Sequence, residues 1–154
     1  FMPRLNQLLT AYGLSRDRIR LEVTERELVV DEGYANTLVT ELVEEGFGFY
    51  LDDFGTGYSN FARVLTMPLE YIKLDKSFLD RSSEEKFDYT VKTLIDLFHH
   101  AGLGVVAEGV ETARQAARLT EIGADCLQGY YYAKPMPAEA FLETIRTQET
   151  REKA

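Results

Sequence analysis

The stretch FYLDDFGTGYSN, residues 49–60, runs from an apolar segment directly into two adjacent carboxylates and then a pair of glycines. Residues 49–51 have the composition of a buried strand that ends there, and Asp52 and Asp53 follow at once. Like charges in contact repel each other, and a desolvated carboxylate is costly unless something neutralises it. Two interpretations are open at this point. Either a cation binds between the acids, or both acids are solvated and the segment is an ordinary turn.

The overall composition indicates one folded, acidic domain. The 154 residues suit a single domain, and the 45% of hydrophobic residues supply a core. The net charge of −9 disfavours long nucleic acid and anionic membrane surfaces as partners. The single cysteine, Cys126, excludes an intramolecular disulfide and favours a reducing compartment, so we expect a cytoplasmic location. No run reaches the roughly 18 apolar residues of a membrane span, so we expect no membrane contact from this segment.

Predicted strands and helices alternate along the whole chain. Apolar alternation predicts strands at residues 18–25, 47–53, 71–75, 104–109 and 125–132. Apolar spacing of three and four predicts helices at residues 5–12, 32–45, 60–68, 84–101, 112–122 and 137–148, most of them ended by glycine or proline. This order is typical of a parallel α/β sheet or a (β/α) barrel.

Each predicted strand brings a polar side chain to its carboxyl end, in chain order Glu25, Asp52 with Asp53, Lys73 with Asp75, Glu108 followed by Glu111, and Gln128. Functional groups of parallel α/β folds gather at that edge of the sheet. An acidic rim of this kind suits Mg²⁺ or Mn²⁺, and adjacent acids suit a two-metal site for phosphodiester hydrolysis. Any one of these acids taken alone is more often a helix cap or a solvated turn. The joint pattern favours the metal site, since independent caps need not fall on five successive strands.

Five motifs in this chain resemble those of the EAL domain, a family that hydrolyses cyclic di-GMP to linear pGpG. They are LEVTE (21–25), LDDFGTGYSN (51–60), IKLDKSFL (72–79), VVAEGVET (105–112) and LQGYYYAKPMP (127–137). The resemblance runs from about residue 18 to residue 142 and implies an α/β, TIM-type barrel of the EAL kind.

The resemblance also implies residue roles. Glu25 and Asp52 would ligate the first Mg²⁺ or Mn²⁺ ion, and Asp52 and Asp53 the second. Lys73 would hold the attacking water, and Glu108 would orient or deprotonate it. Other matching positions would lie near the substrate or the water shell of the metals: Asp75, Glu111 and Gln128.

For regulation, the resemblance implies a loop that links a dimer interface to the metals, with residues Phe54, Gly55, Thr56 and Gly57. It further implies a homodimer or other self-association, and a sensory or GGDEF domain in a parent protein of bacterial signalling.

The beginning of the chain departs from the family pattern. Members begin with a strand that bears a Glu-Ala-Leu signature and continue with a strand that carries a metal-binding Asn, and residues 1–17 resemble neither. We therefore expect a single EAL domain fragment over residues 1–154, the C-terminal two-thirds of the domain, lacking its first strands and frayed at about 149–154. We expect this fragment to hydrolyse cyclic di-GMP weakly or not at all. The alternative is a non-catalytic cyclic di-GMP receptor or regulatory interaction module.

Overall fold

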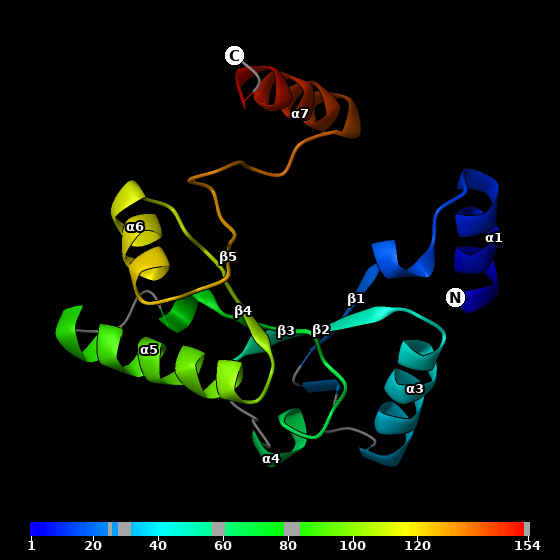
Figure 1. The fold of residues 1–154 in the computed structure, drawn as a ribbon, viewed down its shortest axis with the longest axis horizontal. Helices are drawn as coiled ribbons and strands as arrows, with labels where there is room; N and C mark the ends of the chain where they lie inside the picture. Colours follow the sequence, from blue (N-terminus) through cyan, green and yellow to red (C-terminus); the bar gives the residue numbers. More distant parts are fainter. Residues whose placement is uncertain (25, 28–31, 57–60, 79–83, 153–154) are drawn as a thin grey trace.

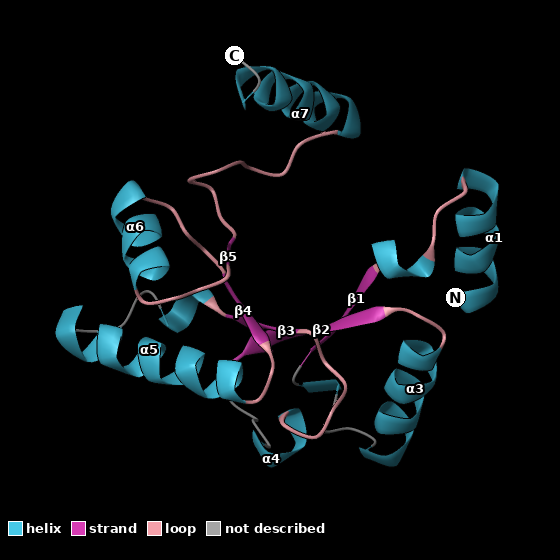
Figure 2. Cartoon of the chain, viewed as in Figure 1, coloured by secondary structure: helices cyan, strands magenta, loops and turns pink. Residues whose placement is uncertain are grey.

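The fold is built on a sheet of parallel strands (Figures 1 and 2). The computed structural model describes residues 1–24, 26–27, 32–56, 61–78 and 84–152. In these ranges five strands follow the order β1-β2-β3-β4-β5, each parallel to its neighbour. They are β1 (Arg20–Thr24), β2 (Gly48–Phe54), β3 (Tyr71–Leu74), β4 (Gly104–Ala107) and β5 (Cys126–Leu127). This arrangement confirms the predicted α/β class and is consistent with part of a TIM-type barrel.

Helices connect the strands, as the alternating pattern predicts. They are α1 (Met2–Tyr12), α3 (Glu32–Glu44), α4 (Phe61–Val64), α5 (Glu84–His100), α6 (Ala113–Glu121) and α7 (Ala138–Glu152). Two short 3₁₀ helices, Arg16–Arg18 and Lys76–Phe78, precede β1 and follow β3. Thr112 and Gln115 begin α6 with a reciprocal capping box. None of the helices in the described ranges is at once long and apolar enough to cross a membrane.

The fifth strand is much shorter than predicted. We expected residues 125–132 to be a strand, but β5 ends at Leu127 and the chain turns across the end of β4. The amide of Val110 donates to the Gln128 carbonyl at 3.0 Å, and the amide of Tyr131 donates to the Val110 carbonyl at 2.9 Å. Gly129 fits against this backbone because a Cβ there would lie 2.1 Å from the Val110 oxygen. The three tyrosines that follow are therefore exposed rather than part of a strand.

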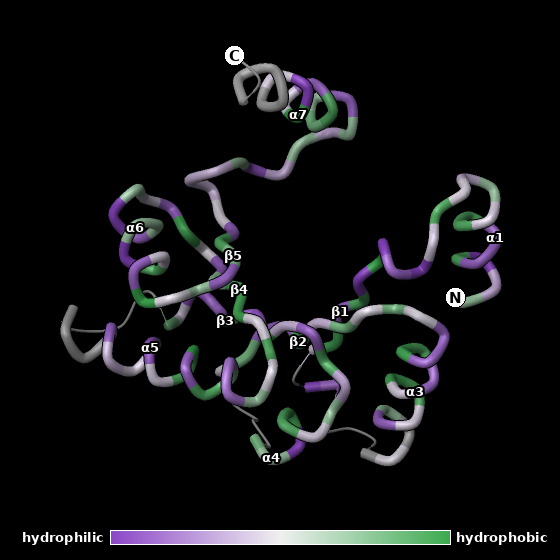
Figure 3. Tube along the Cα trace, viewed as in Figure 1, coloured by the Kyte–Doolittle hydropathy of each residue, from purple (hydrophilic) through white to green (hydrophobic). Residues whose placement is uncertain are grey.

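The hydrophobic core lies between one face of the sheet and the helices that cover it. Alternate strand residues point into this core: Leu21, Val23, Phe49, Leu51, Ile72, Leu74, Val105 and Ala107. The rings of Phe54 and Phe98 meet edge to face at 5.2 Å and join β2 to α5. Figure 3 shows hydrophobic and hydrophilic residues alternating along the helices, as helices with one buried face require.

The opposite face of the sheet is polar. The register pairs Glu22 with Tyr50 and Tyr50 with Tyr71, so these side chains share a face. The Tyr50 and Tyr71 rings lie 4.9 Å apart. Gly104 provides the room for this contact, because a Cβ at that position would lie 2.3 Å from the Tyr71 ring. This polar face leads to the carboxyl ends of the strands.

At the C-terminal end of the chain, α7 lies apart from the helices that cover the sheet (Figure 1), whereas α1 contributes Leu9 to the hydrophobic core. The organisation of residues 1–154 as a single domain and the fraying of residues 149–154 stay predictions.

Two hydrogen bonds to the partly exposed Asp125 carboxylate predict an acid-sensitive contribution to stability. Asp125 Oδ2 accepts hydrogen bonds from His99 Nε2 and from the Val105 amide, both at 2.7 Å, which joins α5 and β4 to the start of β5. Burial alone would raise the pKa of Asp125, but these hydrogen bonds outweigh it and hold the pKa below its usual 3.8. The stabilisation is therefore complete above about pH 4 and is lost as the pH falls through the lower folded pKa.

Asp125→Asn should lower the melting temperature at pH 7, and the gap to the wild type should close at about pH 3, as followed by circular dichroism. The matched control is Asp96→Asn, which removes an exposed ion pair between adjacent turns of α5 and should cost less at pH 7. A gap of equal size at both pH values would contradict the assigned role of the Asp125 charge.

Candidate active site

A β-bulge brings the two adjacent aspartates to the same site. Leu51 pairs with Ile72 and Phe54 pairs with Leu74, so β2 has one more residue than β3 between the two pairs. Asp53 occupies the left-handed region with φ 56°, which is uncommon for a residue other than glycine. In a regular strand, neighbouring side chains point to opposite faces. The bulge removes this constraint, and Asp52 and Asp53 both contribute oxygens to one cluster.

Lys73 lies at the centre of the acidic side chains. Its ammonium is 2.8 Å from Asp52 Oδ1, 2.9 Å from Glu108 Oε1 and 3.0 Å from Glu22 Oε1. The Lys73 side chain is only 7% exposed. Burial alone would lower the pKa of Lys73, but hydrogen bonds to Asp52, Glu108 and Glu22 outweigh it and raise the pKa above its usual value. Lys73 therefore stays charged at every physiological pH.

The carboxylates of Asp52, Asp53 and Glu108 form a candidate cation site. Each offers an oxygen, and these oxygens lie within 4.8 Å of one another. Burial and the negative charges of Asp52 and Asp75 raise the pKa of Asp53 above its usual value, although the Lys73 charge opposes this shift. Asp52 Oδ1 is buried and lies 2.8 Å from the Lys73 ammonium. Carboxylate oxygens are the ligands that hard divalent cations prefer, so these three acids fit such a cation.

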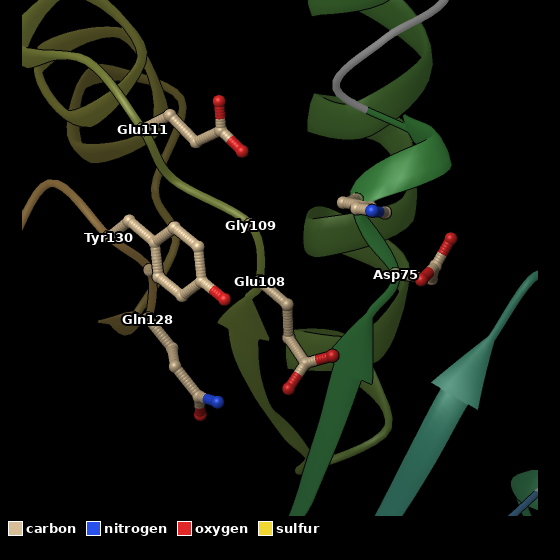
Figure 4. A pocket seen from close by; sticks show the side chains of 8 residues that line it. Asp75, Glu108, Gly109, Glu111, Gln128 and Tyr130 are labelled. Atoms are coloured by element: carbon tan, nitrogen blue, oxygen red, sulfur yellow. The ribbon is translucent and has the colours of Figure 1, made fainter. Parts of the chain in front are cut away.

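A pocket of about 260 Å³ lies beside the carboxylate cluster and shares Glu108 with it. Its lining comes from the ends of β3, β4 and β5: Asp75, Lys76, Glu108, Gly109, Glu111, Gln128, Gly129 and Tyr130. Figure 4 shows Glu108, Gln128 and Tyr130 directed toward the same space. An aromatic ring, an amide and carboxylates beside a cation site can bind a polar ligand with a planar ring.

The structure brings together most of the residues that the sequence singled out. Lys73, Asp52, Asp53 and Glu108 meet at the cluster, and the pocket adds Asp75, Glu111 and Gln128. Burial alone would raise the pKa of Asp75, but hydrogen bonds from Ser77, including its amide at 2.8 Å, lower it. Glu25 lies outside the described residues, so its predicted metal contact stays a prediction.

The predicted loop divides between the core and the surface. Phe54, which we predicted as its first residue, is the last residue of β2 and is buried. Gly55 has φ 98°, and a Cβ there would lie 2.1 Å from the Phe78 ring. The Thr56 hydroxyl donates to the Asp53 carbonyl at 3.1 Å. Gly57 lies outside the described residues.

Sequence reasoning missed Glu22, Lys76 and Tyr130. Glu22 contacts Lys73, and the other two residues line the pocket. A signal for Glu22 was present in the strand itself. Leu21 and Val23 point to the core, so the alternation places Glu22 on the opposite face, where the other strands carry their charged residues.

The family profile, the curated relatives and the solved structures all match this chain to the same family. The EAL domain profile matches residues 1–135, so the match includes the first 17 residues. The cyclic di-GMP phosphodiesterase PdeL of Escherichia coli is 35% identical over 136 residues, which are 88% of this chain and 38% of PdeL.

Solved structures agree with this match. The cyclic di-GMP complex of the phosphodiesterase PaMucR has a TM-score of 0.81 at 32% identity and covers 91% of this chain and 57% of that one. The manganese and cyclic di-GMP complex of Klebsiella pneumoniae BlrP1 has a TM-score of 0.78 at 29% identity and covers 87% of this chain and 34% of that one. The chain thus spans less than two thirds of the length of each of these relatives, and it belongs to the EAL domain family.

Proposed function

We propose that this chain carries the catalytic face of a metal-dependent phosphodiesterase that hydrolyses cyclic di-GMP to linear pGpG. The observation that carries the proposal is the buried Lys73 ammonium amid three carboxylates, at the carboxyl ends of parallel strands and beside an open pocket. The EAL relatives support it, since PdeL is named a cyclic di-GMP phosphodiesterase and PaMucR binds cyclic di-GMP.

Mg²⁺ or Mn²⁺ would be held by Asp52 and Asp53, with Glu25 as a further ligand of the first ion. The cluster of described carboxylates and the manganese in the BlrP1 structure support this assignment. When bound, the ions supply Lewis acidity to the phosphodiester and charge for its leaving oxygen. Asp52 would be a ligand of both ions, as the resemblance to the EAL family implies.

Lys73 and Glu108 would act on the attacking water. Glu108 is only partly buried, and its Oε1 lies 2.9 Å from the Lys73 ammonium. A carboxylate in this position can accept a proton from a water that the ammonium orients. Glu22 also contacts Lys73 and would help to position it.

The pocket would receive the neighbouring part of the substrate. Gln128 and Glu111 offer polar groups for the edge of a base or a sugar, and Tyr130 offers an apolar ring. Asp75 lies across the pocket, with its carboxylate held by Ser77.

The rival function is a non-catalytic receptor or regulatory module that binds cyclic di-GMP. The polar face and the pocket are compatible with binding alone, and only a turnover measurement separates the two functions. For either function we propose a cytoplasmic protein that self-associates, and whose parent protein adds a sensory or GGDEF domain.

The metal assignment predicts a ligand-dependent gain in stability. Mn²⁺ should raise the melting temperature of the wild-type chain, because an ion that binds only the folded state stabilises it. Asp52→Asn should abolish this rise, because it removes the carboxylate whose Oδ1 is buried in the cluster. The control is Asp88→Asn, because Asp88 is outside the cluster and pairs with Arg118, and this variant should keep the rise in melting temperature. An Asp52→Asn chain that still gains the full shift would place the metal elsewhere.

The role of Lys73 predicts a separation of binding from chemistry. Lys73→Ala should keep measurable binding of cyclic di-GMP and lower hydrolysis by at least about 10²-fold, the scale for loss of a positioned acid–base group. The measurement is pGpG release by chromatography, alongside calorimetric titration with substrate. An unchanged turnover number would remove Lys73 from the mechanism.

The 154-residue chain by itself should bind cyclic di-GMP weakly and hydrolyse it poorly. The pocket beside the described carboxylates is open to water, and solvent weakens the electrostatic contacts that a substrate phosphate would make there. The test is pGpG release in saturating Mg²⁺ or Mn²⁺, with light scattering to report the mass of the species. Tight binding without any turnover would favour the receptor function. Rapid turnover by a monomer would show that the described site is sufficient.

A further inference from the structure

The Lys73 ammonium is a cation that already lies inside the cluster assigned to divalent metals. It contacts the carboxylates of Asp52, Glu108 and Glu22 at distances between 2.8 and 3.0 Å. Its side chain is 7% exposed, so bulk water contributes little to solvating the ammonium, and the carboxylates that contact it supply the balancing charge. The chain thus provides its own counter-ion.

The carboxylates that hold Lys73 are also candidate ligands of the metal. Asp52 and Glu108 belong to both groups. Mg²⁺ binds carboxylate oxygens at about 2.1 Å. An ion on Asp52 Oδ1 would therefore stand within about 5 Å of an ammonium that lies 2.8 Å from the same oxygen. Two cations at that separation repel strongly in a site with little water.

We propose that Lys73 is the internal counter-ion of the metal-free site, and that the site takes up a divalent cation by releasing the Lys73 ammonium from Asp52. The ammonium is then available to hold the attacking water. This inference rests on the proposed function and deepens it, because it makes Lys73 a residue that links metal occupancy to readiness for chemistry.

Opposite effects on two measurable quantities distinguish this role from a purely structural one. A neutral side chain at position 73 leaves the acids without a counter-ion, so the metal-free protein should be less stable. The same change removes a competing cation, so the affinity for a divalent metal should rise. If Lys73 only held the carboxylates in place for the metal, its loss would lower both the stability and the affinity.

The experiment compares the wild-type chain with Lys73→Met in a calorimetric titration with Mn²⁺ and in thermal unfolding without metal. Lys73→Met should bind Mn²⁺ at least about tenfold more tightly and should melt at a lower temperature in chelator. Lys73→Gln provides a second neutral variant in case Lys73→Met does not fold. Neither measurement depends on turnover.

Two control variants isolate the charge at this position. Lys73→Arg keeps the charge and should stay within about threefold of the wild-type affinity. Lys92→Met removes an exposed lysine that pairs with Asp96 on α5, and should leave Mn²⁺ affinity unchanged.

Equal or weaker Mn²⁺ binding by both neutral variants, with normal binding by the wild type, would overturn the counter-ion role and leave the proposed function intact. An absence of Mn²⁺ binding in every variant would overturn both.

Discussion

A buried ammonium among carboxylates is the interaction on which the site depends. Lys73 comes from β3, and its three partners come from β1, β2 and the end of β4. The central ammonium offsets the mutual repulsion of these acids, which is least screened by water at Asp52 and Glu108. The ion pairs also connect four neighbouring strands on the polar face, where the described residues form no apolar core. Charge balance at Lys73 thus contributes both to the shape of the sheet edge and to its chemistry.

The β-bulge at Asp53 is the second constraint. Without it, the pleat would direct one of the two adjacent aspartates into the core side of the sheet, where Leu51 and Phe54 are buried. A left-handed backbone at Asp53 is a local cost of the kind that functional sites often carry. This strained backbone conformation brings a second carboxylate, that of Asp53, to the cluster. The bulge also ends β2, so that Gly55 passes closely over the Phe78 ring.

Much of the candidate site was predictable because its residues stand at the ends of regular elements. Asp52, Lys73 and Glu108 follow apolar alternation along three strands, and alternation assigns each to the polar face. Glu22 follows the same rule, but it lies inside a strand, and the sequence pattern indicated only residues at strand ends, such as Glu25. The fifth strand was predicted too long because tyrosines favour strands by propensity. In the fold, Gly129 and the backbone of Val110 turn the chain first.

The sequence by itself determined the α/β alternation, the parallel sheet and the kinds of side chain at the strand ends, because these follow from local periodicity. The proximity of Asp53 to Asp52 depended on an extra residue in β2 relative to β3, and register is a property of a strand pair rather than of either strand. The contacts of Lys73 likewise depended on the register of β1, β2 and β4 relative to β3, which brings Glu22, Asp52 and Glu108 level with the ammonium. Only the tertiary structure decided these distances, because electrostatic interactions act through space between residues far apart in the chain.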